Sequence, residues 1–264
     1  MKETRNMERI PVFRRARGYL LYDSSGNRYL DLYQDGGRAI LGHRIPGMTG
    51  IIKSTASKGL TASYPSVYGR RLSAQLKLLF PEAGEIRFYR NIERALALLS
   101  DYTGENVRLE DFKDFPGTGC RFSIWRPFLE MPDSGFFIPL LPFPGAFGPA
   151  VVVSTGRAGG LAASDVISPL TASMMIKSCA ALKNAQDQAD DKAWEPFDSA
   201  LWSRKGPYLR FGAAEDSHVR LFRAALENGV LLPPDPAVPG IIPLEYEPGQ
   251  IRKFLDAVRR LYAG

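Results

Sequence analysis

Near the start of the chain, short apolar runs alternate with polar residues on both sides of a turn-forming cluster. Tyr19–Tyr22 and Arg28–Leu32 show this alternation, and Asp23–Asn27 lies between them. The pattern predicts two short strands, because glycine and asparagine readily adopt the positive φ angles of a hairpin loop. A glycine-rich bend follows, and then a helix predicted over Met48–Gly59. The opening segment is therefore expected to form a small meander that leads into a helix.

The next segment repeats apolar residues every three or four positions. This spacing predicts a helix that Ser66 caps and that ends before Pro81. A strand is expected over Glu85–Tyr89, followed by a second helix over Ile92–Tyr102 that closes at Gly104. This helix, strand and helix alternation is typical of α/β layering.

Between residues 105 and 149 proline and glycine are frequent, which excludes long helices. A helix is next expected where Ser168 precedes Pro169, because proline is favoured at the first helical position. The strands that fit the central part of the chain are Arg121–Trp125, Phe136–Leu141 and Ala150–Val153.

The last third is again regular. A helix capped by Asp216 or Ser217 is expected to end at Gly229, and a terminal helix to begin at Pro248. The polar tract Gln186–Lys192 is interpreted as a domain boundary. The strands predicted here are Tyr208–Phe211, Val230–Leu232 and Ile241–Leu244.

Composition excludes several function classes. The chain has 264 residues, of which 45% are hydrophobic and 23% are charged, as in an ordinary globular protein. Its 34 Lys and Arg against 28 Asp and Glu give a net charge of +6, but the basic residues are scattered, so no nucleic-acid partner is expected. The longest apolar runs fall well short of the roughly 20 residues of a membrane span, and the first residues lack the apolar core of a signal peptide. We therefore expect a cytoplasmic protein with no membrane partner.

The residues that ligate metals or form disulfides are few. Cys120 and Cys179 lack metal-type spacing and are expected to be free thiols. His43 and His218 are the only histidines, so no metal site is predicted. Gly156, Gly159 and Gly160 lack phosphate-loop spacing and are interpreted as part of a flexible loop.

Several motifs resemble class III aminotransferases, which depend on pyridoxal phosphate (PLP) and include glutamate-1-semialdehyde aminomutase. The run over residues 19–32 and Leu41-Gly42-His43-Arg44-Ile45-Pro46 are similar to the opening of that family. Further similar segments are Leu78–Pro81, Ile86–Phe88, Ser168–Leu170, Gly206–Phe211 and Ala224–Leu231. The resemblance implies a reduced PLP-transferase fold of type I, which is α/β. Residues 1–60 and 186–264 would form a small α+β domain, and residues 61–185 a shortened central α/β domain. It also implies a homodimer.

The chain departs from this family where the cofactor would bind. The family holds the phosphate with a Ser-Gly-Thr loop, but the corresponding residues, 89–93, contain no glycine, and only Arg90 could hold an anion by charge. PLP chemistry also needs a lysine that carries the aldehyde and an acidic partner for the ring nitrogen. No lysine lies between Lys113 and Lys177, and Lys177 falls within a helix as a surface lysine. The acidic partner is also missing, because the sequence around Asp165, Glu130 and Asp133 does not match the family's at that position.

No residue is therefore predicted to be catalytic, and no cofactor is predicted. The resemblance leaves three residues of a vestigial cleft. Tyr64 lies near the family's substrate-side loop, Arg90 follows the Arg-Phe strand, and Ser164 aligns with a family threonine that touches the phosphate across the dimer interface.

The sequence thus favours an aminotransferase-like protein that has lost PLP-dependent transamination and serves in binding or assembly. The alternative is an enzyme that acts on a small amino- or phospho-metabolite, either as a PLP-dependent aminotransferase or aminomutase or through a remodelled activity. In that case Arg90, Arg157 or Arg210 would supply positive charge to a small anionic ligand, and PLP would be retained only if the aminotransferase chemistry is.

Overall fold

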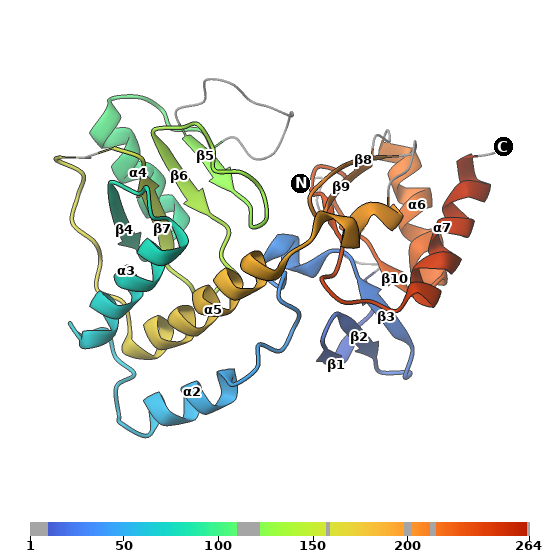
Figure 1. The fold of residues 1–264 in the computed structure, drawn as a ribbon, viewed down its shortest axis with the longest axis horizontal. Helices are drawn as coiled ribbons and strands as arrows, with labels where there is room; N and C mark the ends of the chain where they lie inside the picture. Colours follow the sequence, from blue (N-terminus) through green and yellow to red (C-terminus); the bar gives the residue numbers. More distant parts are fainter. Residues whose placement is uncertain (1–9, 110–121, 157–158, 198–201, 212–214, 263–264) are drawn as a thin grey trace. The chain divides into compact units, whose positions relative to one another are not determined.

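The computed structural model describes residues 10–109, 122–156, 159–197, 202–211 and 215–262 (Figure 1). The chain divides into two compact units. One contains Met1–Arg44 and Ala189–Gly264, and the other contains Ile45–Gln188. Residues 45–60, which the sequence analysis grouped with the chain ends, belong to the second unit, because helix α2 (Met48–Ala56) packs against helix α5 (Pro169–Gln188).

The unit of the chain ends contains a four-stranded sheet with the order β1-β2-β3-β10. Its strands are β1 (Phe13–Arg17), β2 (Leu20–Asp23), β3 (Arg28–Asp31) and β10 (Val230–Leu231). The predicted hairpin is confirmed as the antiparallel pair β2–β3, and β10 runs parallel to β3 with Val230 opposite Leu30. Strand β1 was not predicted, because Arg14, Arg15 and Arg17 interrupt its apolar pattern.

A second sheet in this unit has the order β11-β9-β8. Trp202 packs edge-on against Phe211 and stacks on Phe254 of the terminal helix. Apolar side chains of the sheet therefore pack against that helix. The remaining elements are η1 (Gln34–Gly37), η2 (Asp191–Phe197), β8 (Trp202–Lys205), β9 (Tyr208–Phe211), α6 (Glu215–Glu227), β11 (Gly240–Ile241) and α7 (Pro248–Tyr262).

Two predictions for this unit are corrected. Helix α6 begins at Glu215, so Asp216 and Ser217 lie within its first turn and do not precede it as caps. The strand expected over Ile241–Leu244 is limited to Gly240–Ile241, since only these two residues pair with β9.

The bend after β3 is held by the buried carboxylate of Asp31. This carboxylate accepts hydrogen bonds from the backbone N–H groups of Tyr33 and Gln34, and His43 Nε2 lies 2.8 Å from its other oxygen. A Cβ atom at Gly42, where φ is +78°, would lie 3.1 Å from the carbonyl oxygen of Gly18. The Leu-Gly-His motif is thus accounted for by tight packing of the bend.

The unit of residues 45–188 contains a mixed sheet with the order β4-β7-β6-β5. Strand β4 pairs antiparallel with β7, β7 pairs antiparallel with β6, and β6 pairs parallel with β5. The strands are β4 (Glu85–Tyr89), β5 (Phe122–Trp125), β6 (Phe136–Pro139) and β7 (Ala150–Ser154), and the further helices are α3 (Val67–Leu79) and α4 (Ile92–Thr103). These elements confirm the predicted helix, strand and helix order.

Helix α4 and the end of α3 meet opposite faces of this sheet. Tyr89, Val152 and Ile138 belong to the cluster that buries Ala95 and Leu99 of α4. Phe80, which directly follows α3, packs edge-on against Trp125 and Phe137, whose side chains lie on the opposite face of the sheet. Helix α5 packs against both α2 and α3 (Figure 1). The sheet therefore has helical segments packed on both of its faces.

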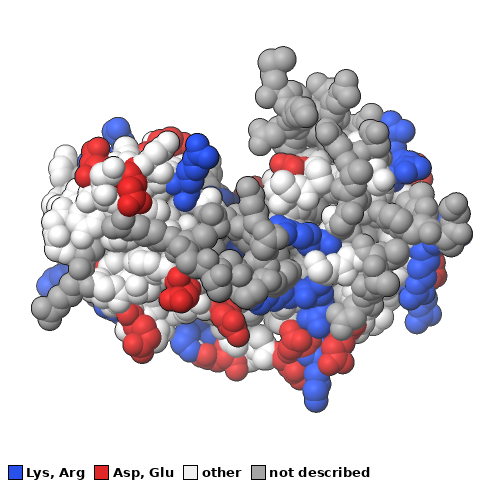
Figure 2. All heavy atoms as spheres, turned by 90° about the horizontal axis from the view of Figure 1, so that it is seen from above, with Lys and Arg blue, Asp and Glu red and all other residues white. Residues whose placement is uncertain are grey.

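Two surface properties bear on partners. No helix of the described residues combines the length and the apolar character needed to cross a membrane. Figure 2 shows that basic and acidic side chains are interspersed on the face in view, as expected from their scattering along the sequence.

Candidate functional site

Residues 162–165 run beside the outer edge of β4. The Phe88 N–H donates to Ser164 Oγ at 3.1 Å, and the Asp165 N–H donates to the Phe88 carbonyl oxygen at 2.8 Å. The Tyr89 hydroxyl donates to the Ala162 carbonyl oxygen at 2.8 Å. This segment therefore supplies hydrogen-bond partners to a strand edge that would otherwise be open.

Helix α4 begins directly after β4, and its N-terminus is well capped. The Asn91 side chain accepts a hydrogen bond from the Arg94 N–H at 3.0 Å. The Asp165 carboxylate accepts the Arg90 N–H at 2.9 Å and the Arg94 Nε–H at 2.8 and 3.1 Å. The hydrogen-bonded Arg94 guanidinium holds the pKa of Asp165 below its usual range, and the same contact raises the pKa of Arg94. An anionic side chain thus lies at the positive end of α4.

A pocket of about 330 Å³ lies between the start of α3 and β4. Arg70 and Arg87 are the basic residues of its lining and Asp165 is the acidic one, and Tyr64 forms an exposed aromatic wall. The full lining is Tyr64, Pro65, Ser66, Gly69, Arg70, Ser73, Ile86, Arg87, Phe88, Ser164, Asp165, Val166 and Ile167.

The polar groups of this pocket are suited to a small anion. Arg87 forms an ion pair with Glu85, but its Nε atom is buried without a hydrogen-bond partner. Ser66 occupies the N-cap position of α3, yet its side chain makes no capping hydrogen bond, contrary to the predicted cap. Charged guanidinium groups and hydroxyls donate strong hydrogen bonds to carboxylate and phosphate oxygens. The pocket can therefore hold an anionic group against an apolar wall.

The structure brings two of the three predicted cleft residues into this pocket, Tyr64 and Ser164. Arg90 follows β4, and its N–H binds Asp165, but it is not part of the lining. Arg210 lies in β9 of the other unit, and Arg157 falls outside the described residues.

Sequence reasoning missed Arg70 and Arg87 and rejected Asp165. In the sequence, both arginines look like ordinary polar residues of a predicted helix and a predicted strand. Asp165 could not be placed at α4, because nothing in its local sequence indicates pairing with a strand 75 residues earlier.

The described residues that line this pocket do not fit PLP. The pocket lining contains no lysine, and Asp165 places a negative charge at the helix end where a phosphate would need positive partners. Lys177 lies on α5 near Gly47, where a Cβ atom would be 3.5 Å from its Cε and 3.7 Å from its Nζ. Lys77 donates to the Ala83 carbonyl oxygen, and Lys183 pairs with Asp187. None of these three lysines lines the pocket.

A metal site finds no support either. Within the described ranges, no group of three or more His, Cys, Asp or Glu side chains lies close enough together to hold a metal ion. Cys179 is a buried free thiol, and Cys120 falls outside the described residues.

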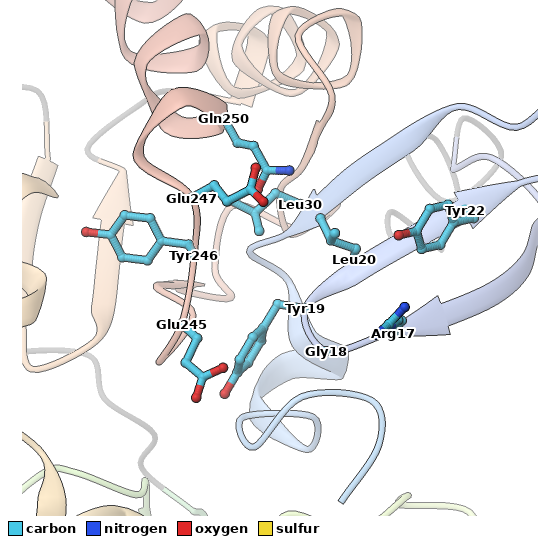
Figure 3. A pocket seen from close by; sticks show the side chains of 10 residues that line it. All are labelled: Arg17, Gly18, Tyr19, Leu20, Tyr22, Leu30, Glu245, Tyr246, Glu247 and Gln250. Carbon is cyan, nitrogen blue, oxygen red and sulfur yellow. The ribbon is translucent and has the colours of Figure 1, made fainter.

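The unit of the chain ends has a separate pocket of about 550 Å³. Figure 3 shows Tyr19 with Glu245 at one end and Glu247 with Gln250 at the other. Burial raises the pKa of Tyr19, whose hydroxyl donates to the Ile40 carbonyl oxygen at 2.9 Å. Glu247 precedes α7, where an acidic side chain complements the helix dipole. Helix stabilisation thus accounts for this acidic residue without a ligand.

Comparison with known sequences gives both full-length and partial likenesses. No protein-family model matches the chain. An uncharacterised protein of Borreliella burgdorferi is 27% identical over 248 residues, which cover 94% of this chain and 90% of that protein. Glutamate-1-semialdehyde 2,1-aminomutase of Thermus thermophilus is 34% identical over 98 residues, which cover 36% of this chain and 23% of that enzyme.

Comparison with solved structures establishes the fold. An omega-transaminase from Sphaerobacter thermophilus gives a TM-score of 0.70 at 12% identity and covers 96% of this chain and 91% of its own. Acetylornithine aminotransferase from Elizabethkingia anophelis gives 0.68 at 14% identity, covering 96% and 94%. The chain of 264 residues therefore has the mixed α/β PLP-transferase fold of aminotransferases, as predicted. The partial aminomutase match supports a relation to class III aminotransferases.

Proposed function

We propose that this chain is an aminotransferase-fold protein that has lost PLP-dependent transamination and acts as a homodimeric binding or assembly protein. The observation that carries the proposal is the placement of Lys177. Lys177 belongs to α5, and its side chain lies beside Gly47. The donors of the candidate site instead belong to β4, α3 and α4. PLP chemistry needs a lysine amine at the cofactor aldehyde.

A second observation supports the same proposal. The α4 N-terminus already carries the Asp165 carboxylate and the Asn91 cap. A phosphate there would face a like charge with its best donors already in use. We therefore attribute the degenerate cofactor site, which the sequence predicts, to a change from transamination to binding or assembly.

The test is covalent trapping. Purified protein is mixed with PLP, its absorbance is recorded, and borohydride is added before peptide mass spectrometry. We expect no lysine-bound PLP band and no stoichiometric adduct, while free lysines give only trace labelling. A single lysine labelled in full would refute the proposal, and loss of that label in Lys177→Ala would identify the lysine.

The assembly part of the proposal has its own measurement. Size-exclusion chromatography with light scattering should give twice the chain mass, since two-fold dimers are the commonest homo-oligomers and the fold relationship implies one. A monomer at all concentrations tested would remove the homodimer from the proposal.

The pocket beside α3 favours one alternative, an enzyme acting on a small amino- or phospho-metabolite. Arg70 would hold the anionic group there, because Arg87 already pairs with Glu85. A ligand at 100 times its Kd stabilises the native state by about 2.7 kcal/mol, which thermal-shift screening detects. Under this alternative, a stabilising metabolite should lose its effect in Arg70→Gln. Arg71→Gln is the matched control, because Arg71 lies over the Tyr68 ring on the same helix and outside the pocket lining.

A further inference from the structure

The pocket of about 550 Å³ in the unit of the chain ends has walls of opposite charge. Arg17 comes from the end of β1, whereas Glu245 and Glu247 come from the segment that leads into α7. Figure 3 shows Arg17 on the side of the sheet strands and the two glutamates on the side of residues 245–250. A ligand that fills this pocket therefore meets a cation on one side and carboxylates on the other.

The floor of the pocket is apolar, and the register of the sheet explains why. Arg17 lies opposite Leu20, which lies opposite Leu30, so these three side chains share one face of the sheet. Tyr22 is on the same face, because it is two residues from Leu20 along the strand. Leu30 is buried, but Leu20 and Tyr22 are only half-buried. Part of their apolar surface is therefore open to a ligand.

The fold itself does not use the two nearest opposite charges. The side chains of Arg17 and Glu245 are exposed, and neither forms an ion pair or a hydrogen bond with another residue of the described part of the chain. Glu247 directly precedes α7 and complements its dipole, whereas Glu245 lies two residues earlier. Unpaired opposite charges at one cavity suit a ligand that carries both charges.

We propose that this pocket binds a dipeptide with an apolar side chain. The dipeptide carboxylate pairs with Arg17, its ammonium pairs with Glu245, and its apolar side chain rests on the sheet face at Leu20. The volume fits, because small-molecule sites occupy about 300 to 1,000 Å³. A single amino acid carries both charges on one carbon, whereas the pocket presents its charges on opposite walls. A longer peptide would leave one charged end outside.

The inference goes beyond the proposed loss of transamination and uses no step of that proposal. The pocket belongs to the unit of Met1–Arg44 and Ala189–Gly264, whereas Lys177 and the candidate site belong to the other unit. Lysine trapping and dipeptide binding are separate measurements on separate residues. Each idea can therefore fail alone.

The experiment is titration calorimetry of the full chain with matched probes. Alanyl-leucine carries both charges, N-acetyl-alanyl-leucine lacks the ammonium, and alanyl-leucinamide lacks the carboxylate. We expect saturable binding of alanyl-leucine and about tenfold weaker binding of each blocked peptide, because each loses one charge-assisted contact. Leucine should also bind about tenfold more weakly, because it satisfies only one wall.

Two variants assign each charge to its wall. Arg17→Gln should weaken alanyl-leucine binding about tenfold but leave alanyl-leucinamide binding unchanged, because the amide has no carboxylate to lose. Glu245→Gln should weaken alanyl-leucine in the same way but leave N-acetyl-alanyl-leucine unchanged. Arg14→Gln is the matched control, since Arg14 is an exposed arginine of the same strand that lies outside the pocket lining. It should bind every probe like the unaltered chain.

Four results would each overturn the inference. The first is the absence of saturable alanyl-leucine binding up to about 10 mM. The second is equal binding of alanyl-leucine and both blocked peptides, and the third is leucine binding as tight as that of alanyl-leucine. The fourth is a loss in Arg14→Gln equal to the loss in Arg17→Gln, which would indicate a general charge effect. Circular dichroism checks that the variants, all at exposed positions, keep their fold.

Discussion

Tyr89→Phe tests whether residues 162–165 are held on β4 by specific hydrogen bonds. The Tyr89 side chain is fully buried, and its hydroxyl donates to the Ala162 carbonyl oxygen at 2.8 Å. Phenylalanine keeps the ring in the core cluster and removes only the hydroxyl. The change therefore isolates one bond between the strand and the segment.

The expected cost follows from the burial of the two partners. A net hydrogen bond contributes about 1 kcal/mol, and a fully buried partner left unsatisfied raises the loss toward about 3 kcal/mol. Ala162 is half-buried, so water can reach part of its surroundings. We therefore expect Tyr89→Phe to lower the free energy of unfolding by about 1 to 1.5 kcal/mol. Ser164→Ala removes the acceptor of the Phe88 N–H and should cost about 1 kcal/mol.

The two changes should also be coupled, because both bonds fix the same short segment. Once one bond is lost, the segment is looser and the second bond contributes less. The double variant should therefore cost less than the sum of the single variants, by about 0.5 kcal/mol or more.

Urea unfolding measures these free energies, and hydrogen exchange of the Phe88 amide reports the local effect. Tyr102→Phe is the control. Tyr102 packs on the same core, edge-on to Phe136 at 5.8 Å, but its hydroxyl has no hydrogen bond to another described residue. Its removal should change stability by less than about 0.5 kcal/mol. If Tyr89→Phe costs no more than Tyr102→Phe, the Tyr89 hydroxyl does not anchor the segment.

Three other changes probe the fold around the site. Gly84→Ala would place a Cβ atom 2.2 Å from the Gly156 carbonyl oxygen, so it should destabilise the β4–β7 pair by about 1 to 3 kcal/mol in urea unfolding, whereas Gly156→Ala meets open space and should be nearly neutral. Burial lowers the pKa of His218 below its ordinary 6.5, so the unfolded chain binds the proton more readily. Stability should therefore fall as pH drops from 7 toward 5, and a slope that persists unchanged in His218→Gln would contradict this. Burial raises the pKa of the Cys179 thiol to about 12, so in Cys120→Ser protein iodoacetamide should label Cys179 only after unfolding, and rapid native labelling would show that the thiol is accessible.

The sequence predicted the elements whose apolar spacing is regular. Helices α3 and α4 follow their patterns closely, because each buries one apolar stripe, and strand β4 has its predicted bounds. Strand β1 escaped prediction for the opposite reason. It is an edge strand that pairs only with β2, and its arginines face water. Its sequence therefore shows no alternation of apolar and polar residues.

The candidate site was predictable only in part. The family resemblance pointed to Tyr64 and Ser164, which the fold brings into one pocket. Asp165 could not be interpreted in the same way, because its role depends on the register between an irregular segment and β4. Hydrogen bonds between residues about 75 positions apart leave no periodic signal in the sequence.

One segment links the pocket beside α3 with the N-terminus of α4. Residues 164–167 line the pocket, while the Asp165 carboxylate accepts hydrogen bonds from the Arg90 N–H and the Arg94 side chain. Anchoring this segment on β4 therefore completes the wall of the pocket. A small anion that binds this pocket should contact Arg70. Asp165→Ala, which removes the hydrogen bonds to Arg90 and Arg94, should loosen that wall and weaken any ligand that Arg70 holds.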